Sequence, residues 1–179
     1  MTRKHFDEQL ALLKKLLTEM GGLNCDAIEN AVNALERQDP ALAKKTKAIE
    51  TQVDEKESEV ERLCLKIILK QQPVASDLLF VTSAMKMITD MERIADQAVD
   101  ISDLVVKMSS LPYAEQLSEI AEMAEKVRDM VRMVVEAFVE LSTEKARDVC
   151  RAADDIDDLF ERVKGKVTGV VHKDIEEDA

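Results

Sequence analysis

The sequence contains no tryptophan, one tyrosine and four phenylalanines among 179 residues, and only four glycines and three prolines. So few glycines and prolines leave little material for the tight turns that a β-rich fold needs. Apolar residues still make up 46% and charged residues 35% of the chain, so leucine, isoleucine, valine, alanine and methionine must form the core. This composition is typical of long amphipathic helices.

Cysteine pairs and long apolar runs are also absent. Cys25, Cys64 and Cys150 lie far apart and form no CxxC pair, and Cys64 within LCLKII is expected to be a buried, reduced thiol. No apolar run approaches the roughly 18 residues that span a bilayer. The first residues, MTRKHFDEQL, lack the apolar segment of a signal peptide. We therefore expect a soluble cytoplasmic protein.

Positive charge is scarce, because the formal net charge is −12 at pH 7. A chain with this balance has little with which to neutralise a polyphosphate backbone, which argues against binding of nucleic acid. It favours cations or a basic surface on a partner protein.

The few turn signals divide the chain into helices. They are Asp39-Pro40, Gln72-Pro73, Ser110-Leu111-Pro112 and Ser142-Thr143. They predict an all-α fold with five long helices over 4–38, 40–71, 74–109, 113–141 and 143–172, packed as antiparallel neighbours because the turns are short. The pair Gly21-Gly22 is expected to kink or loosen the first helix.

A weak internal repeat relates the two halves of the chain. FDEQL from Phe6 is similar to YAEQL from Tyr113, and DPALA from Asp39 corresponds to STEKA from Ser142. We therefore predict two tandem three-helix bundles, over residues 1–110 and 111–179. The second bundle would hold only two helices in this chain, and the bare apolar face that this leaves predicts a homo-oligomer.

Acidic residues form a stripe along the third predicted helix, with Glu92, Asp96 and Asp100 spaced by four. The apolar seam of the same helix is predicted at Met87, Met91, Ile94, Ala98, Ile101 and Val105. At about 100° per residue the acids lie about 170° from this seam, so we expect them to point away from the core.

The second predicted helix carries a similar stripe, formed by Glu50, Asp54, Glu57 and Glu61. Equal distances from the turn at 72–73 should bring Glu50 and Asp54 level with Glu92 and Asp96. Facing carboxylates with few lysines between them predict a surface site for hard divalent or trivalent cations. A solvated acidic face remains the alternative. The fifth helix repeats the pattern weakly at Asp154, Asp157, Asp158 and Glu161, with Ala153 where Glu50 would correspond.

Two longer phrases, QQPVASDL over 71–78 and DMERIADQAVDI over 90–101, resemble the PhoU family of phosphate-signalling proteins. The resemblance implies two similar three-helix bundles and a regulator rather than an enzyme. Such regulators repress the phosphate-starvation response by coupling the phosphate ABC transporter ATPase to a membrane sensor histidine kinase.

The resemblance also implies a metal site on the bundle surface, for iron or zinc, with magnesium or manganese as alternatives. The implied ligands are Glu50, Asp54, Glu92 and Asp96, with Asp100 as a weaker addition. Two positions depart from the family pattern: Ala95 replaces a usual glycine and Gln97 a usual histidine.

Arg93 lies within the second phrase, and two interpretations of it remain open. It is either a partner-binding residue or one half of a surface ion pair of little energetic weight. For the protein as a whole, the alternative to a regulator is a metal-free helical scaffold or oligomerisation protein. A metal-dependent enzyme is disfavoured, because the sequence has no nucleophile–base pattern and no phosphate-binding loop.

Overall fold

The computed structural model describes the backbone of residues 3–108 and 117–177, and the side chains of residues 4–107 and 119–166. It contains five helices: α1 (Arg3–Arg37), α2 (Pro40–Gln71), α3 (Ser76–Met108), α4 (Leu117–Glu140) and α5 (Thr143–Glu177). The prediction of an all-α fold is confirmed. The turn predicted at Ser110–Pro112, the predicted helix start at 113 and the predicted boundary between the two bundles lie outside the described residues.

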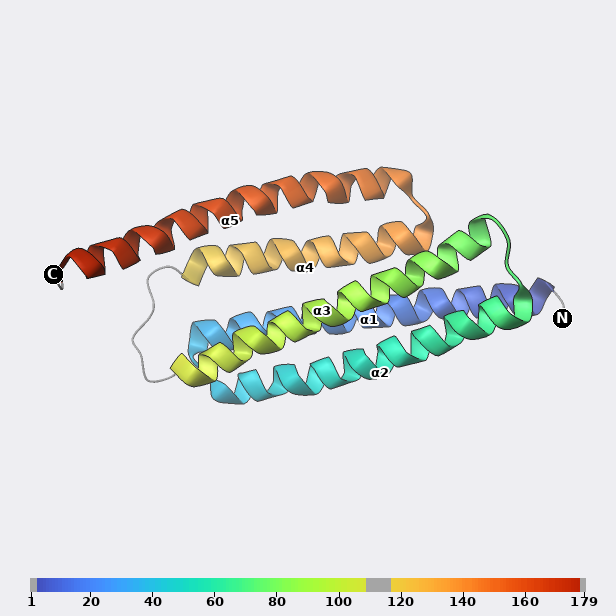
Figure 1. Ribbon diagram of the computed structural model, residues 1–179, viewed down its shortest axis with the longest axis horizontal. Helices are drawn as coiled ribbons and strands as arrows, with labels where there is room; N and C mark the ends of the chain where they lie inside the picture. The colour runs from blue at the N-terminus through green and yellow to red at the C-terminus, as the bar shows by residue number, and fades with distance from the viewer. Residues whose placement is uncertain (1–2, 109–116, 178–179) are drawn as a thin grey trace.

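The helices form a bundle and an attached hairpin (Figure 1). Helices α1, α2 and α3 pack against one another, whereas α4 packs on α1, and α5 packs on α4. Within the described residues, α4 is therefore the only element through which α5 reaches the rest of the fold. No described helix is long and apolar enough to cross a membrane.

The α1–α2 and α4–α5 connections are built in the same way, which supports the internal repeat. Gln38 and Leu141 each have a positive φ, 51° and 57°. The next residue in each case, Asp39 or Ser142, closes the preceding helix by donating its N–H to the carbonyl five residues earlier, at 3.0 Å and 2.9 Å. This is the Schellman ending of a helix. The side chains of Asp39 and Ser142 then cap the next helix, accepting the N–H groups of Ala41 and Lys145.

The core is largest where the α2–α3 turn meets α1. Large apolar side chains fill it, including Leu13, Leu17, Met20, Ile67, Val81 and Ile88. Towards the other end of the bundle the buried residues become small, and Ala27, Ala31 and Ala98 form their own cluster. Helices that meet through alanine approach one another closely, which brings the polar edges of α2 and α3 together at this end.

The predicted apolar seam of α3 is wrong in part. Met91, Ala98 and Val105 are buried as expected, but Ile94 is only half-buried and Ile101 is exposed. The buried line runs instead through Val81, Ala84, Ile88, Met91, Ala95, Ala98, Ser102 and Val105. α3 has two apolar faces, one towards α1 and α2 and one towards α4. The predicted seam mixed residues of both faces, so its direction lay between them.

This rotation changes where the acids lie. The buried face of α3 is turned by about 60° towards the acidic stripe, taking 100° per residue. Glu92 is consequently half-buried at the edge of the core, whereas Asp96 and Asp100 are exposed. On α2, Glu50 is buried, with 6% of its surface exposed. The expectation that the acids of α3 point away from the core is therefore wrong for Glu92.

Candidate functional site: an acid cluster between α2 and α3

The register between α2 and α3 is marked by one cross-helix hydrogen bond. The Thr89 hydroxyl donates to Glu57 Oε1 at 3.4 Å. Because the helices are antiparallel, a step of three residues back from Glu57 along α2 matches a step of three residues forward from Thr89 along α3. Asp54 is therefore level with Glu92. Four more residues bring Glu50 level with Asp96. We call these four residues the acid cluster.

The charges within the acid cluster act on one another. Partial desolvation, followed by the negative charges of Glu50 and Asp96, raises the pKa of Asp54. Burial, then the charges of Asp96, Glu57 and Asp54 and a hydrogen bond with Asp96, raises the pKa of Glu92. Both effects disfavour the ionised carboxylates. A nearby positive charge would favour the ionised forms again.

Lys47 supplies a positive charge at this point. Its ammonium Nζ lies 2.8 Å from Glu50 Oε1, one turn along α2. The hydroxyl of Thr51 lies 3.4 Å from the other oxygen, Glu50 Oε2, but its nearer acceptor is the Lys47 carbonyl at 3.1 Å. The pKa of Lys47 is raised by the hydrogen bond to Glu50, and the charges of Glu50, Asp54 and Asp96 contribute.

Sequence reasoning missed Lys47, because it compared the acids only with one another. The signal was present: Lys47 precedes Glu50 by three residues, a spacing that places both side chains on one face of a helix. The predicted cation site assumed that few lysines lie between the acids and did not take Lys47 into account.

Asp100, the fifth predicted ligand, lies outside the acid cluster. It is exposed, one turn further along α3, and the register places it level with the buried Thr46 rather than with an acid. Its charge is not among those that raise the pKa of Asp54 or Glu92.

The acid cluster contains the oxygen ligands that hard cations prefer, but their arrangement does not form a ready metal site. No three His, Cys, Asp or Glu side chains within the described residues are grouped so that they could hold a metal ion. One oxygen of Glu50, Oε1, already accepts a hydrogen bond from Lys47. The residues as arranged do not fit an iron or zinc centre, and metal binding there stays a prediction.

The acids of α5 are separated from this cluster by the rest of the fold. Asp154, Asp157, Asp158 and Glu161 are exposed. Asp155 and Asp158 line a polar hollow of about 570 Å³ with Glu122, Lys126 and Arg162. Here acids alternate with basic side chains, so this surface is close to charge-balanced.

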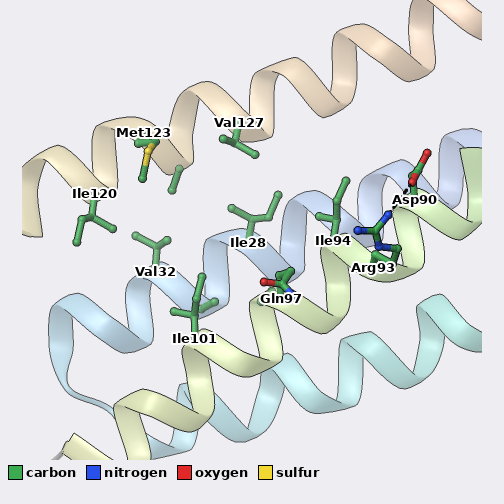
Figure 2. A pocket seen from close by; sticks show the side chains of 13 residues that line it. Ile28, Val32, Asp90, Arg93, Ile94, Gln97, Ile101, Ile120, Met123 and Val127 are labelled. Carbon is green, nitrogen blue, oxygen red and sulfur yellow. Dashed lines mark hydrogen bonds and ion pairs between the residues drawn. The ribbon is translucent and has the colours of Figure 1, made fainter. Parts of the chain in front are cut away.

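Arg93 is also on α3, next to Glu92 in the sequence, and it borders the space between α3 and α4 (Figure 2). It is exposed, and its Nη1 pairs with Asp90 Oδ1 at 3.4 Å. Both residues border an apolar cavity of about 500 Å³ between α1, α3 and α4. The apolar lining is Ile28, Ala31, Val32, Ile94, Ala98, Ile101, Ile120, Met123, Ala124 and Val127. The surface ion pair that one interpretation expected is therefore present, and partner binding by Arg93 stays a prediction.

Comparison with known proteins identifies the class to which this helical fold belongs. The profile of the PhoU domain matches residues 17–105 and 120–178. The crystal structure of PhoU from Pseudomonas aeruginosa superimposes with a TM-score of 0.89 at 26% identity, over 96% of this chain and 82% of that one. A phosphate transport system regulatory protein PhoU from Streptococcus pneumoniae, 23% identical, shares the fold with a TM-score of 0.85.

Sequence relatives agree with the structural match. A phosphate-specific transport system accessory protein PhoU homolog from Clostridium acetobutylicum is 33% identical over 175 residues, which cover 97% of this chain and 80% of the relative. The homolog from Zymomonas mobilis is 33% identical, over 89% of this chain and 67% of its own length. The homolog from Pseudomonas putida is 29% identical, over 86% of this chain and 60% of its own length. The chain belongs to the PhoU family, as the resemblance of its two phrases predicted.

Proposed function

We propose that this protein is an accessory regulator of a phosphate transport system. It represses the phosphate-starvation response by coupling a phosphate ABC transporter to a sensor histidine kinase. The observation that carries the proposal is the PhoU match over both halves of the chain, with relatives named as accessory proteins of phosphate-specific transport.

The charge pattern suits a protein that works by contact. With a net charge of −12, the acidic faces of α2 and α3 favour basic surfaces on the transporter ATPase or the kinase. The acid cluster holds carboxylates and one ammonium group, without a nucleophile and base in hydrogen-bond contact, so it suits recognition better than catalysis. We place the regulator in the cytoplasm, where it meets the membrane through these partners.

Arg93 is the residue that we propose for partner contact. An exposed guanidinium beside an apolar cavity resembles the arginine-plus-apolar centres that carry much of the energy in protein interfaces. Its pairing with Asp90 is long and exposed, so a carboxylate of a partner competes with it at little cost.

The decisive experiment measures the phosphate-starvation response in the organism's own cells. Deleting the gene should switch on a starvation-responsive reporter at high phosphate, and the wild-type gene should restore repression. A reporter that stays repressed after deletion would reject the regulatory function. The alternative, a metal-free scaffold or oligomerisation protein, predicts that neither the transporter ATPase nor the kinase is captured by the purified protein.

A charge reversal separates the role of Arg93 from the function of the whole chain. Arg93→Glu should weaken capture of the ATPase or the kinase at least tenfold. The control Lys66→Glu makes the same charge change at an exposed position of α2 and should leave capture unchanged. Equal effects of the two variants would mean that net charge, rather than the mouth of the cavity, controls the interaction.

A further inference from the structure

Glu50 has the strongest need for a counter-ion in the acid cluster. It is buried, with 6% of its surface exposed, and an ionised carboxylate that leaves water must be paired and hydrogen-bonded. The structure meets this need from within α2, because the ammonium group of Lys47 reaches Glu50 Oε1 at 2.8 Å.

The ammonium group of Lys47 also serves acids beyond Glu50. The register places Asp96 opposite Glu50 and Asp54 one turn further along α2, and the charges of both act on Lys47. The side chain of Lys47 is 62% exposed and that of Glu50 8%, so the lysine covers the buried acid from the solvent side. A cation from solution that binds Glu50 Oε1 would have to displace Lys47 from it.

We propose that Lys47 is the resident cation of the acid cluster: its ammonium group pairs with Glu50 and partly offsets the charges of Asp54 and Asp96, in the place that a metal ion would take. The cluster thus differs from the metal site that the family resemblance implies for the same acids. The regulatory function does not depend on this inference, because contact with partners requires no metal in the cluster.

The physical basis is that the lysine is tethered. Lys47 is three residues from Glu50 on the same helix, so its pairing costs no translational entropy, whereas a metal ion loses part of its hydration shell and its translational freedom. A metal ion would also have to break the contact between Lys47 and Glu50. It would further need to draw together carboxylates that do not converge within the described part of the chain.

The test compares metal binding by four proteins: wild type, Lys47→Met, Lys47→Arg and Lys45→Met. Lys45 is exposed on α2 and points to another side of the helix, about 200° from Lys47, so its loss is a matched control for net charge. The probes are Zn²⁺ and, under anaerobic conditions, Fe²⁺. Binding is measured by calorimetry and by elemental analysis after desalting.

Wild type, Lys47→Arg and Lys45→Met should retain no stoichiometric metal. Lys47→Met should bind at least tenfold more tightly than wild type, and adding Asp96→Asn to it should remove the gain. A second readout is the melting temperature at low salt in the presence of a chelator. Lys47→Met should melt at a lower temperature than Lys45→Met, and Zn²⁺ should restore part of the loss.

Two results would overturn the inference. One is stoichiometric Zn²⁺ or Fe²⁺ on the wild-type protein that Asp96→Asn abolishes, which would make the metal ion the resident cation. The other is a Lys47→Met protein whose metal affinity and melting temperature equal those of Lys45→Met, which would show that Lys47 neutralises nothing of consequence.

Discussion

Gly21 of α1 lies directly against Val135 of α4, and a methyl group added to this glycine would sit 2.9 Å from Cγ2 of the valine. Both residues are buried. α1 runs without interruption through Gly21 and Gly22, so the expected loosening of the helix at this pair is wrong. The first glycine serves instead to bring the two halves of the protein into contact.

Gly21→Ala should therefore weaken the contact between α1 and α4. The added methyl meets a stiff β-branched side chain, and overpacking of this kind costs about 1–3 kcal/mol, which outweighs the gain of about 1 kcal/mol in helix propensity. Gly22→Ala is the matched control, because nothing lies within 4 Å of its added methyl. It should stabilise by about 0.5–1 kcal/mol. Urea unfolding measures both.

A second substitution tests whether the clash is the cause. Val135→Ala removes the methyl that Gly21→Ala would meet, so the double variant should be more stable than the sum of the two single changes predicts. Additive effects would assign the loss to α1 itself rather than to its contact with α4.

A stacked aromatic pair connects α3 and α4. The rings of Phe80 and Phe138 are 4.7 Å apart between centroids and inclined by 15°. Phe138→Leu should lose about 0.5–1.5 kcal/mol of stability, because offset aromatic stacking contributes this much beyond burial. Phe160, on α5, is 51% exposed, so Phe160→Leu should change the unfolding free energy by less than about 0.5 kcal/mol. Similar losses from both would argue against the stacking.

The course of the helices could be predicted because turn chemistry is local. Asp39-Pro40 and Ser142-Thr143 each supply a capping oxygen at a fixed position, and α2 and α5 begin there. The start of α3 was placed two residues early because Gln72 and Ala75 both adopt positive φ angles. Neither residue is a glycine, so the sequence gives no sign of these conformations.

Which acids of the acid cluster lie level with one another could be predicted from the sequence, but how deeply they are buried could be predicted less well. Counting from a short turn fixes which residues are level, because both helices rise by the same distance per residue. The rotation of α3 about its axis depends on α4, a helix from the other half of the chain. A sequence pattern averages the two apolar faces, so the half-buried position of Glu92 could not be read from spacing alone.

The Schellman ending of α4 offers a stabilising substitution. Leu141 is 67% exposed and holds a φ of 57°, in the left-handed region that costs an L-residue about 1 kcal/mol and glycine almost nothing. Leu141→Gly should raise the free energy of unfolding by about 1 kcal/mol. Leu141→Ala keeps the Cβ and the strain, so it should give no such gain. If both variants lost stability equally, the contacts of the leucine side chain would dominate.

Cys64 predicts a loss of stability at alkaline pH. Burial, with a contribution from the charge of Glu61, raises the pKa of this thiol to about 11, whereas a thiol in the unfolded chain titrates near 8.5. A raised pKa means that the folded protein holds the proton while the unfolded chain releases it. The stability that the neutral thiol contributes is thus complete below about pH 8.5 and is lost as the pH rises towards 11.

Cys64→Ala removes this titration and is the control, although it also lowers stability at every pH by leaving a small cavity. Between pH 8.5 and 10.5, the free energy of unfolding of the wild type should fall by on the order of 1–2 kcal/mol more than that of the variant. Urea unfolding at several pH values measures the two slopes. Because lysine and tyrosine titrate in both proteins, only the difference between the slopes reports Cys64. Parallel slopes would mean that the thiol meets the same surroundings in the folded and the unfolded chain, in conflict with its complete burial on α2.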